Sequence, residues 1–279
     1  MCLKTLLIVD GCNLLFQMFC GMPARILNAK GQAIQGTLGF TGALLKMLRM
    51  TQATHVAVLF DGACDNPRRE MDAEYKANRE PLPEEENPFS QLPDVYRVLD
   101  YLHIPHAETT CCEFDDWAAA YAKNRPVDTK IVIASQDSDF FQLISENVHV
   151  LRYRGDLSVV CDPGYIREKL GIEPEQYADF KSLTGDTADN IRGAEKVGPK
   201  TAAALLQQFG DLENLLTHAQ EIAKPSVRQS VSQSADRLRL NYRLIKLDGQ
   251  AALPFAIDDL TYTPMGLTTN QILTDIGLR

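Results

Sequence analysis

The sequence lacks the features that would place a protein in a membrane or a secretory pathway. In its 279 residues, no apolar run approaches the roughly 18 residues that would span a bilayer. The apolar stretch at the N-terminus is interrupted by Asp10, and no small-residue cleavage site follows it, so we read no signal peptide. No internal repeat and no low-complexity tract is present. We therefore expect a cytoplasmic protein without membrane contact.

Cysteine patterns suited to a disulfide framework or a zinc site are also absent. The seven cysteines are odd in number and contain no CxxC spacing. Cys111 and Cys112 are adjacent, which suits neither an ordinary disulfide nor a pair of zinc ligands. This usage predicts reduced thiols.

An excess of basic residues is absent as well. The chain has 28 Lys and Arg against 37 Asp and Glu, which gives a formal charge of −9. Taken alone, this charge argues mildly against nucleic acid as a partner. The composition is otherwise that of a globular protein, with 45% hydrophobic residues. The length suits one large domain, or a large domain and a small one.

Short apolar runs predict the strands of a parallel sheet. Their unbroken apolar character is typical of strands that are buried on both faces. Helical spacing lies between them, so the chain is expected to form βαβ units and an α/β fold. The strands are predicted at 4–9, 55–60 and 130–135, the helices at 37–50 and 115–123, and an edge pair at 149–154 and 157–161. Further helices are predicted at 175–183, 200–209, 211–218 and 226–247.

The same patterns divide the chain into parts. A charged, proline-rich segment at about 68–93 is too long and polar to be a plain connection, and long loops in compact domains are usually functional or disordered. We expect an α/β domain at 1–165 that contains this loop, a smaller helical domain at 166–251, and a weakly patterned tail at 252–279.

Acidic residues gather where the predicted strands end. The first two strands are followed at once by an acid, and the third is followed by the pair Asp137 and Asp139 after one glutamine. Another acidic cluster opens the helix before the third strand, and a last one lies between two helices of the second domain. The nine acids are Asp10, Asp61, Glu113, Asp115, Asp116, Asp137, Asp139, Asp186 and Asp189. Any single cluster is more often a turn or a helix cap. The carboxyl ends of parallel strands, however, meet at one edge of a sheet.

So many carboxylates at one edge would repel one another unless cations offset their charge. Carboxylate oxygens suit Mg²⁺ or Mn²⁺, and two such ions clamp an in-line phosphoryl displacement. The nine acids equal the whole net charge of −9, so the remaining residues sum to about zero. The acidic balance therefore does not exclude a nucleic-acid substrate.

Two segments carry candidates for contact with phosphate. Tyr75, Lys76 and Arg79 lie in the proline-rich segment; such a charged loop is usually a solvated face, but above a carboxylate edge its cations would meet phosphate and Tyr75 would stack on a base. The second-domain loop has glycines for close backbone approach and a proline that starts a helix. Its candidates are Arg192, Gly193, Lys196, Gly198, Lys200 and Thr201. The alternative is a plain helix–loop–helix packing element.

This ordered set of motifs resembles the 5′-nuclease family, which includes flap endonucleases and the 5′→3′ exonuclease domain of bacterial DNA polymerase I. The residues that carry the resemblance are the strand-end aspartates, YKANR, the ExDD cluster, DxD after a strand, and GDxxDNI before a Gly-Lys-Thr hairpin, from about residue 4 to about 250. The resemblance implies a PIN-like sheet with helices on both faces, an arch over the site, and a helix–three-turn–helix domain that grips duplex DNA, with a K⁺ ion on hairpin carbonyls.

The resemblance also implies roles for single residues. Asp10, Asp61, Glu113, Asp115 and Asp116 would surround a first divalent metal, and Asp137, Asp139, Asp186 and Asp189 a second. Lys76 would reach the scissile phosphate, with Arg79 assisting from the arch. Lys196 departs from the family pattern, because that hairpin position is often Gly, and Arg192 stands where Pro is common.

The expected activity is metal-dependent 5′→3′ exonuclease and 5′-flap endonuclease cleavage of DNA, leaving 5′-phosphate and 3′-hydroxyl ends, in primer or flap removal. No polymerase domain follows Arg279, so we expect a stand-alone, monomeric exonuclease. Two alternatives stay open: a ribonuclease on a similar carboxylate edge, and a structure-specific DNA-binding protein that barely cleaves. The nine acids count against a pure binder, which gains nothing from anions near phosphate.

Overall fold

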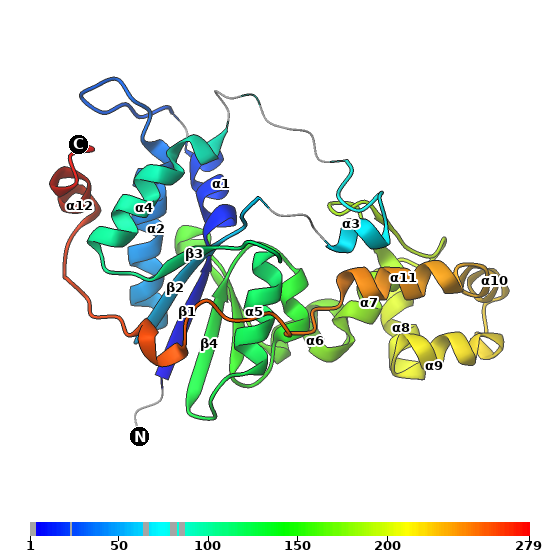
Figure 1. Ribbon diagram of the computed structural model, residues 1–279. Helices are drawn as coiled ribbons and strands as arrows, with labels where there is room; N and C mark the ends of the chain where they lie inside the picture. The colour runs from blue at the N-terminus through cyan, green and yellow to red at the C-terminus, as the bar shows by residue number, and fades with distance from the viewer. Residues whose placement is uncertain (1–3, 23, 64–66, 79–82, 84–86) are drawn as a thin grey trace.

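The computed structural model describes residues 4–22, 24–63, 67–78, 83 and 87–279. Its centre is a six-stranded sheet in the order β3-β2-β1-β4-β5-β6 (Figure 1). Neighbouring strands are parallel, except that β6 runs antiparallel to β5. The strands are β1 (Lys4–Asp10), β2 (His55–Phe60), β3 (His106–Glu108), β4 (Thr129–Ala134), β5 (Val148–Arg152) and β6 (Val159–Cys161). The three predicted strands and the edge pair are confirmed; β3 was missed because three half-exposed residues give no pattern.

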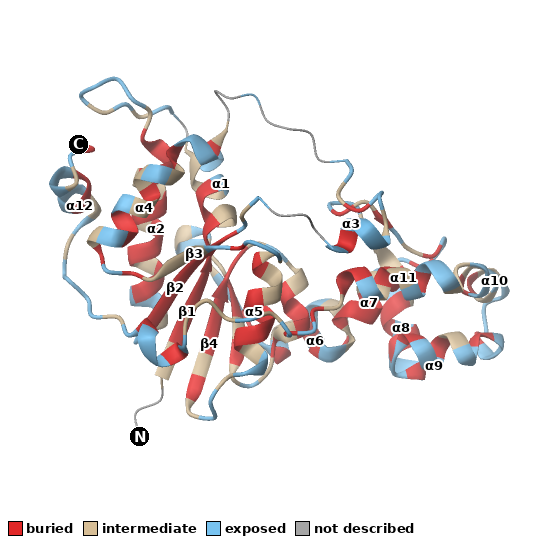
Figure 2. Ribbon diagram, viewed as in Figure 1, coloured by how far each residue is buried: buried red, intermediate tan, exposed pale blue. Residues whose placement is uncertain are grey.

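Both faces of the sheet are covered by helices. In β1, Leu7 and Val9 join one apolar cluster and Leu6 and Ile8 the other, because successive side chains of a strand point to opposite faces. The first face is covered by α1 (Gly11–Gly21), α2 (Gln35–Thr51), α4 (Leu92–Tyr101) and α12 (Thr269–Asp275), and the second by α5 (Phe114–Lys123). Burial on both sides explains the unbroken apolar runs, and Figure 2 shows these strands as largely buried.

A helical domain continues from the second face of the sheet. It consists of α6 (Pro163–Leu170), α7 (Tyr177–Thr184), α8 (Pro199–Phe209), α9 (Leu212–Thr217), α10 (Pro225–Gln233) and α11 (Ala235–Ile245), with a small ribbon of β7 (Gly185–Asp186) and β8 (Ile191–Arg192). Most of its buried apolar side chains belong to the same cluster as those of α5, and a few form a small separate cluster. The predicted single helix at 226–247 is wrong: the chain breaks at Ser234, a residue type that favours helix ends.

The C-terminal segment returns to the first domain. The Trp117 indole nitrogen donates to the carbonyl of Ala252 at 2.9 Å, and the Tyr121 hydroxyl donates to that of Phe255 at 3.0 Å. Ile272 of α12 is fully buried in the cluster that contains α2 and α4. A segment with weak sequence patterning is therefore an integral part of the core.

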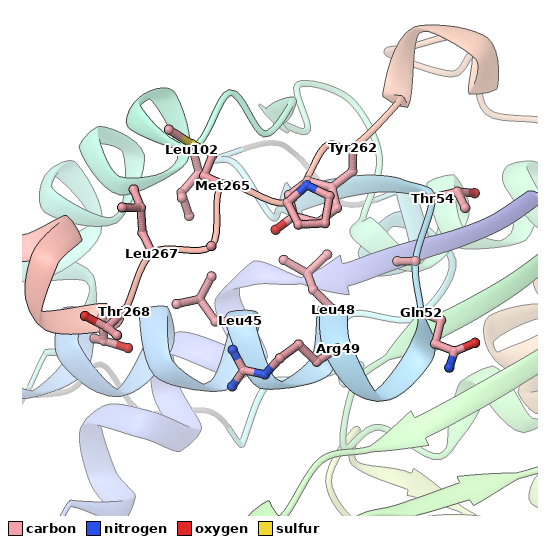
Figure 3. A pocket seen from close by; sticks show the side chains of 14 residues that line it. Leu45, Leu48, Arg49, Gln52, Thr54, Leu102, Tyr262, Met265, Leu267 and Thr268 are labelled. Atoms are coloured by element: carbon pink, nitrogen blue, oxygen red, sulfur yellow. The ribbon is translucent and has the colours of Figure 1, made fainter.

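A cavity of about 760 Å³ lies between α2 and the segment that leads to α12 (Figure 3). Its lining is mostly apolar and includes Leu45, Leu48 and Tyr262, with Arg49 among the polar residues. Thr54, which also lines it, directly precedes β2, so the cavity lies at the edge where this strand begins, opposite the edge where the acids follow.

Of the helices in the described ranges, none is long and apolar enough to cross a membrane.

Candidate active site

The ends of β1, β2 and β4 bring three acids to one edge of the sheet. Asp10 ends β1 and caps α1: one carboxylate oxygen accepts from the Asn13 amide and the other from the Ser135 hydroxyl, each at 2.9 Å. Because β1 pairs with both β2 and β4, Asp61 and Asp137 lie near Asp10. Burial, then the negative charges of Asp61 and Asp137, raise the pKa of Asp10 to about 7.

The start of α5 is tied to this edge. The Phe114 amide donates to Asp61 Oδ1 at 2.6 Å, so the first turn of the helix is held against the end of β2. Asp115 follows in that turn. Burial and the neighbouring charges of Asp137, Glu113 and Asp61 raise its pKa well above the usual value. Asp115 therefore faces the strand-end acids, as the sequence predicted.

A second group of acids comes partly from the helical domain. Asp139 begins the 3₁₀ helix η3 (Asp139–Leu143), and Asp186 and Asp189 belong to β7 and the turn after it. Burial, together with the charges of Asp137, Asp186 and Asp189, raises the pKa of Asp139 to about 8, although Lys181 opposes this. The buried Oδ1 of Asp139 has no hydrogen-bond partner among the described residues. The two domains thus meet at this group.

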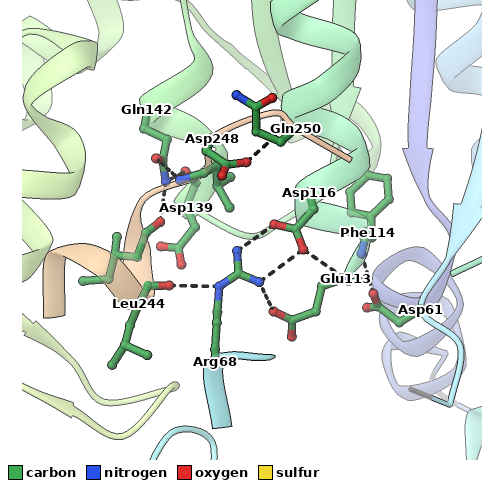
Figure 4. Close-up of polar contacts among 12 residues, drawn as sticks. Asp61, Arg68, Glu113, Phe114, Asp116, Asp139, Gln142, Leu244, Asp248 and Gln250 are labelled. Atoms are coloured by element: carbon green, nitrogen blue, oxygen red, sulfur yellow. Dashed lines mark hydrogen bonds and ion pairs between the residues drawn. The ribbon is translucent and has the colours of Figure 1, made fainter. Parts of the chain in front are cut away.

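Cations of the chain itself neutralise part of the site. Lys76 Nζ lies 2.5 Å from Glu113 Oε1, and Lys181 forms an ion pair with Asp186. Arg68 pairs with Glu113 and with Asp116 (Figure 4). Sequence reasoning missed Lys181, because a lone cation in a helix carries no distinguishing spacing.

The acids do not form a closed cage in this structure. In the parts of the chain that are described, no group of three or more His, Cys, Asp or Glu side chains is arranged to hold a metal ion. Arg68, Lys76 and Lys181 already engage some of the nine acids, and the assignment of these acids to two metal sites stays a prediction.

The donor chemistry nevertheless fits divalent cations. The acids supply only oxygen atoms, the preferred ligands of Mg²⁺ and Mn²⁺. Burial and crowding hold the pKa values of Asp10, Asp115 and Asp139 high. Lys76 opposes the shift at Asp115 and Lys181 the shift at Asp139, but neither cation cancels it. Within the described ranges, Oδ1 of Asp139 is a buried acceptor without a donor.

The described base of the arch, residues 72–78, is docked on the helical domain. The Lys76 amide donates to the Asp189 carbonyl at 3.0 Å, and the Asn190 side-chain amide donates to the Glu74 carbonyl at 2.8 Å. These contacts place the Lys76 ammonium among the acids. The nearby Tyr75, Glu113 and Asp189 outweigh burial and raise the pKa of Lys76, so the ammonium stays charged. Arg79 lies outside the described residues.

The prediction that Tyr75 stacks on a base needs correction. Its side chain is only 4% exposed and packs with Ala178, Ile191, Leu244 and Ile245 of the helical domain. A ring held in an apolar cluster is not available to a nucleotide. Tyr75 is instead the hydrophobic anchor of the arch base.

The predicted DNA-binding residues of the hairpin fall into two groups, one that packs within the ribbon and one that is exposed. A Cβ on Gly193 would lie 2.4 Å from the Leu183 carbonyl oxygen and 2.6 Å from the Gly185 amide, so glycine is required for close packing in the ribbon. Arg192, Lys196, Gly198 and Lys200 are exposed, and Thr201 is half-buried. Lys196 has a φ of 62°, the left-handed region in which glycine is favoured.

Two family models match consecutive parts of the chain. Residues 5–171 match the model of the 5′-3′ exonuclease N-terminal resolvase-like domain, and residues 172–267 match that of the 5′-3′ exonuclease C-terminal SAM fold. The chain belongs to the 5′-3′ exonuclease family. It is therefore a member of a nuclease family, as its motifs predicted.

Named relatives and solved structures agree with this assignment. The chain is 35% identical over 268 residues to DNA polymerase I of Rhizobium leguminosarum, covering 93% of this chain and 26% of that protein. It is 34% identical over 254 residues to the thermostable DNA polymerase I of Thermus aquaticus, covering 90% and 29%. A bacteriophage T5 flap endonuclease, in complex with DNA and metal ions, shares the fold with a TM-score of 0.73 at 22% identity, covering 98% of each chain. The Rad2 catalytic core with a DNA substrate gives 0.58 at 17%, covering 98% and 92%.

The chain spans less than a third of the length of the DNA polymerases that it resembles, between 26% and 31% of each. The likeness to the T5 and Rad2 structures concerns the fold.

Proposed function

We propose that this chain is a divalent-metal-dependent 5′→3′ exonuclease and 5′-flap endonuclease that hydrolyses DNA to 5′-phosphate and 3′-hydroxyl ends, in primer or flap removal. One observation carries the proposal: acids from three strand ends, from the start of α5 and from the β7 turn meet at one edge, with pKa values that are raised where they are most buried. The family assignment and the metal ions bound by the T5 relative support it.

The metal ligands in this proposal are eight of the nine acids, all except Asp116. They are Asp10, Asp61, Glu113 and Asp115 for one ion, and Asp137, Asp139, Asp186 and Asp189 for the other. When bound, two divalent ions supply activation of water and neutralisation of phosphate charge. Mg²⁺ and Mn²⁺ are the ions that suit such oxygen ligands.

The chain's own groups bind and orient the DNA. Lys76, held beside Glu113, presents a permanent positive charge to the phosphate that is cleaved. The exposed residues Arg192, Lys196 and Lys200, with the amides at the start of α8, contact the duplex backbone. The assistance of Arg79 and a K⁺ ion on the hairpin carbonyls stay predictions, as do the cytoplasmic location, the monomeric state and the division into domains at 1–165 and 166–251.

The proposed function is tested with a 5′-flap DNA duplex, incubated with and without Mg²⁺, and the product lengths are resolved. Cleavage from or near the 5′ end that stops in excess chelator and returns with Mg²⁺ or Mn²⁺ is the expected result. Single-stranded RNA in a parallel reaction separates the ribonuclease alternative. Full activity in excess chelator contradicts the assignment of the acids, and binding without cleavage favours a DNA-binding protein.

A further inference from the structure

Arg68 joins three separate parts of the molecule at one buried point. It belongs to the short helix α3 (Pro67–Met71), which directly precedes the arch base, and is only 8% exposed. Its Nε donates to the Leu244 carbonyl at the end of α11, at 3.0 Å. Its Nη1 and Nη2 donate to Glu113 Oε2 at 2.8 Å and to Asp116 Oδ1 at 2.7 Å (Figure 4). The arch, the helical domain and the start of α5 therefore share this guanidinium.

The hydrogen bonds of Asp116 connect it to Arg68 and to the start of α5. Its Oδ1 accepts from Arg68 Nη2, while its Oδ2 accepts from the Glu113 amide at 3.1 Å and from Arg68 Nη1 at 3.3 Å. Both carboxylate oxygens of Asp116 therefore accept hydrogen bonds from Arg68, and one of them also accepts from the residue that caps α5. Its neighbour Asp115 interacts with the strand-end acids instead. Adjacent residues of a helix point about 100° apart, so the two side chains serve different groups.

We propose that Arg68 is a positioning residue for the nuclease site and that Asp116 acts by holding Arg68 rather than by binding metal. The guanidinium sets the position of Glu113 and keeps the end of α11 and the arch base against α5. A planar fork with several donors suits this task, because it satisfies three acceptors from three directions at once. Only the part that concerns metal rests on the proposed function.

The pairing is tested by thermal unfolding in excess chelator, with Arg68→Gln, Asp116→Asn and the double variant. Each single change breaks the charge pair between buried Arg68 and half-buried Asp116 and is expected to lower Tm by about 5–10 °C. The double variant should lose no more than the worse single variant, because the two changes break the same contact. Arg167→Gln, which breaks an exposed Arg–carboxylate pair with Glu173, is the control and should change Tm by less than about 2 °C. Additive losses would overturn the pairing.

The metal part is tested by titrating Mn²⁺ into DNA-free protein and following the free ion by electron paramagnetic resonance. Asp115→Asn should lower the affinity at least tenfold, whereas Asp116→Asn should change it less than threefold. Equal losses in the two variants would show that Asp116 is a ligand. If the wild-type protein binds no Mn²⁺, the proposed metal site fails, and with it the statement about Asp116 and metal. The thermal unfolding of the single and double variants still decides whether Arg68 and Asp116 are paired.

A positioning role further predicts a rate effect that stability alone does not. In single-turnover cleavage at saturating DNA and Mg²⁺, well below every Tm, Arg68→Gln should slow the reaction about 10–100-fold, the range for groups that orient ligands. Asp116→Asn should add nothing in that background, Arg68→Lys should restore part of the rate, and Arg167→Gln should leave it unchanged. A wild-type rate for Arg68→Gln would reduce Arg68 to a purely structural residue.

Discussion

Two lysines that look alike in the sequence occupy different electrostatic settings. Lys76 is half-buried beside Glu113 and held by the arch base, whereas Lys200 is exposed at the start of α8. We expect Lys76→Ala to lower kcat about 10²–10³-fold, because it removes a cation from the charge that develops on phosphate. Lys200→Ala should weaken DNA binding, because it removes one contact with the DNA backbone. The slope of the logarithm of the DNA-binding constant against the logarithm of the salt concentration should fall by about one unit.

Single-turnover cleavage over a range of salt concentrations separates these two effects. More DNA or less salt should largely rescue Lys200→Ala and should not rescue Lys76→Ala. If both variants show the same salt-sensitive defect, Lys76 is only another phosphate anchor.

Lys196 pays a conformational cost at a hairpin position. Its φ of 62° is unfavourable for a residue with a Cβ by about 1–2 kcal/mol. We therefore expect Lys196→Gly to be more stable than Lys196→Ala by about 1 kcal/mol, since both remove the charge and only glycine relieves the strain. Denaturant unfolding measures the difference. DNA affinity should fall equally in the two variants, and equal stabilities would show that the loop carries no such strain.

The arch base is held to the helical domain by polar contacts and by one buried side chain, that of Tyr75. Replacing Tyr75 with alanine should lower the free energy of unfolding by about 3–5 kcal/mol, as for other large aromatic truncations in a core. Tyr75→Phe keeps the ring and should cost less than about 1.5 kcal/mol. Urea unfolding compares the two. A similar small loss in both would mean that the ring contributes little and that the arch base is held by its polar contacts.

At the scale of the elements, helices and strands are most predictable from the sequence where their burial is regular. The strands β1, β2 and β4 were predictable because both of their faces are covered, and Asp10, Asp61 and Asp137 followed from their ends. Tyr75 was misread because an aromatic ring in a charged loop looks exposed until the loop's docking partner is known. The pairing of Arg68 with Asp116 joins residues 48 positions apart, and no local spacing encodes such a contact.

At the scale of the whole molecule, the site exists only when both domains are docked. Asp186 arrives from the helical domain and pairs there with Lys181. We expect Asp186→Ala to lower turnover by at least about 100-fold, because a proposed ligand is lost, while DNA binding is kept or becomes tighter as an anion near phosphate disappears. Asp259→Ala, at an exposed acid of η7 (Ile257–Leu260), is the control. Wild-type turnover in Asp186→Ala would contradict a site built from two domains.

The concentration of buried acids also makes the stability of the whole protein depend on pH and metal together. The pKa values of Asp10 and Asp139 are raised to about 7 and about 8, far above their usual value of 3.8. At pH values between 3.8 and the raised pKa, each of these two groups keeps a proton in the folded protein that it releases in the unfolded chain. The free energy of unfolding therefore falls as pH rises. Each group contributes a slope of up to about 1.4 kcal/mol per pH unit.

In chelator, Tm should therefore fall between pH 5 and pH 8, and Asp139→Asn should flatten that fall. Mg²⁺ should raise Tm more at pH 8 than at pH 5, because at the lower pH the ion must displace protons from its ligands. Melting curves at both pH values, with and without Mg²⁺, measure these shifts. A Mg²⁺-induced rise in Tm of the same size at pH 5 and pH 8 would mean that the ion does not bind at these protonated carboxyls, and the crowding of acids would need another explanation.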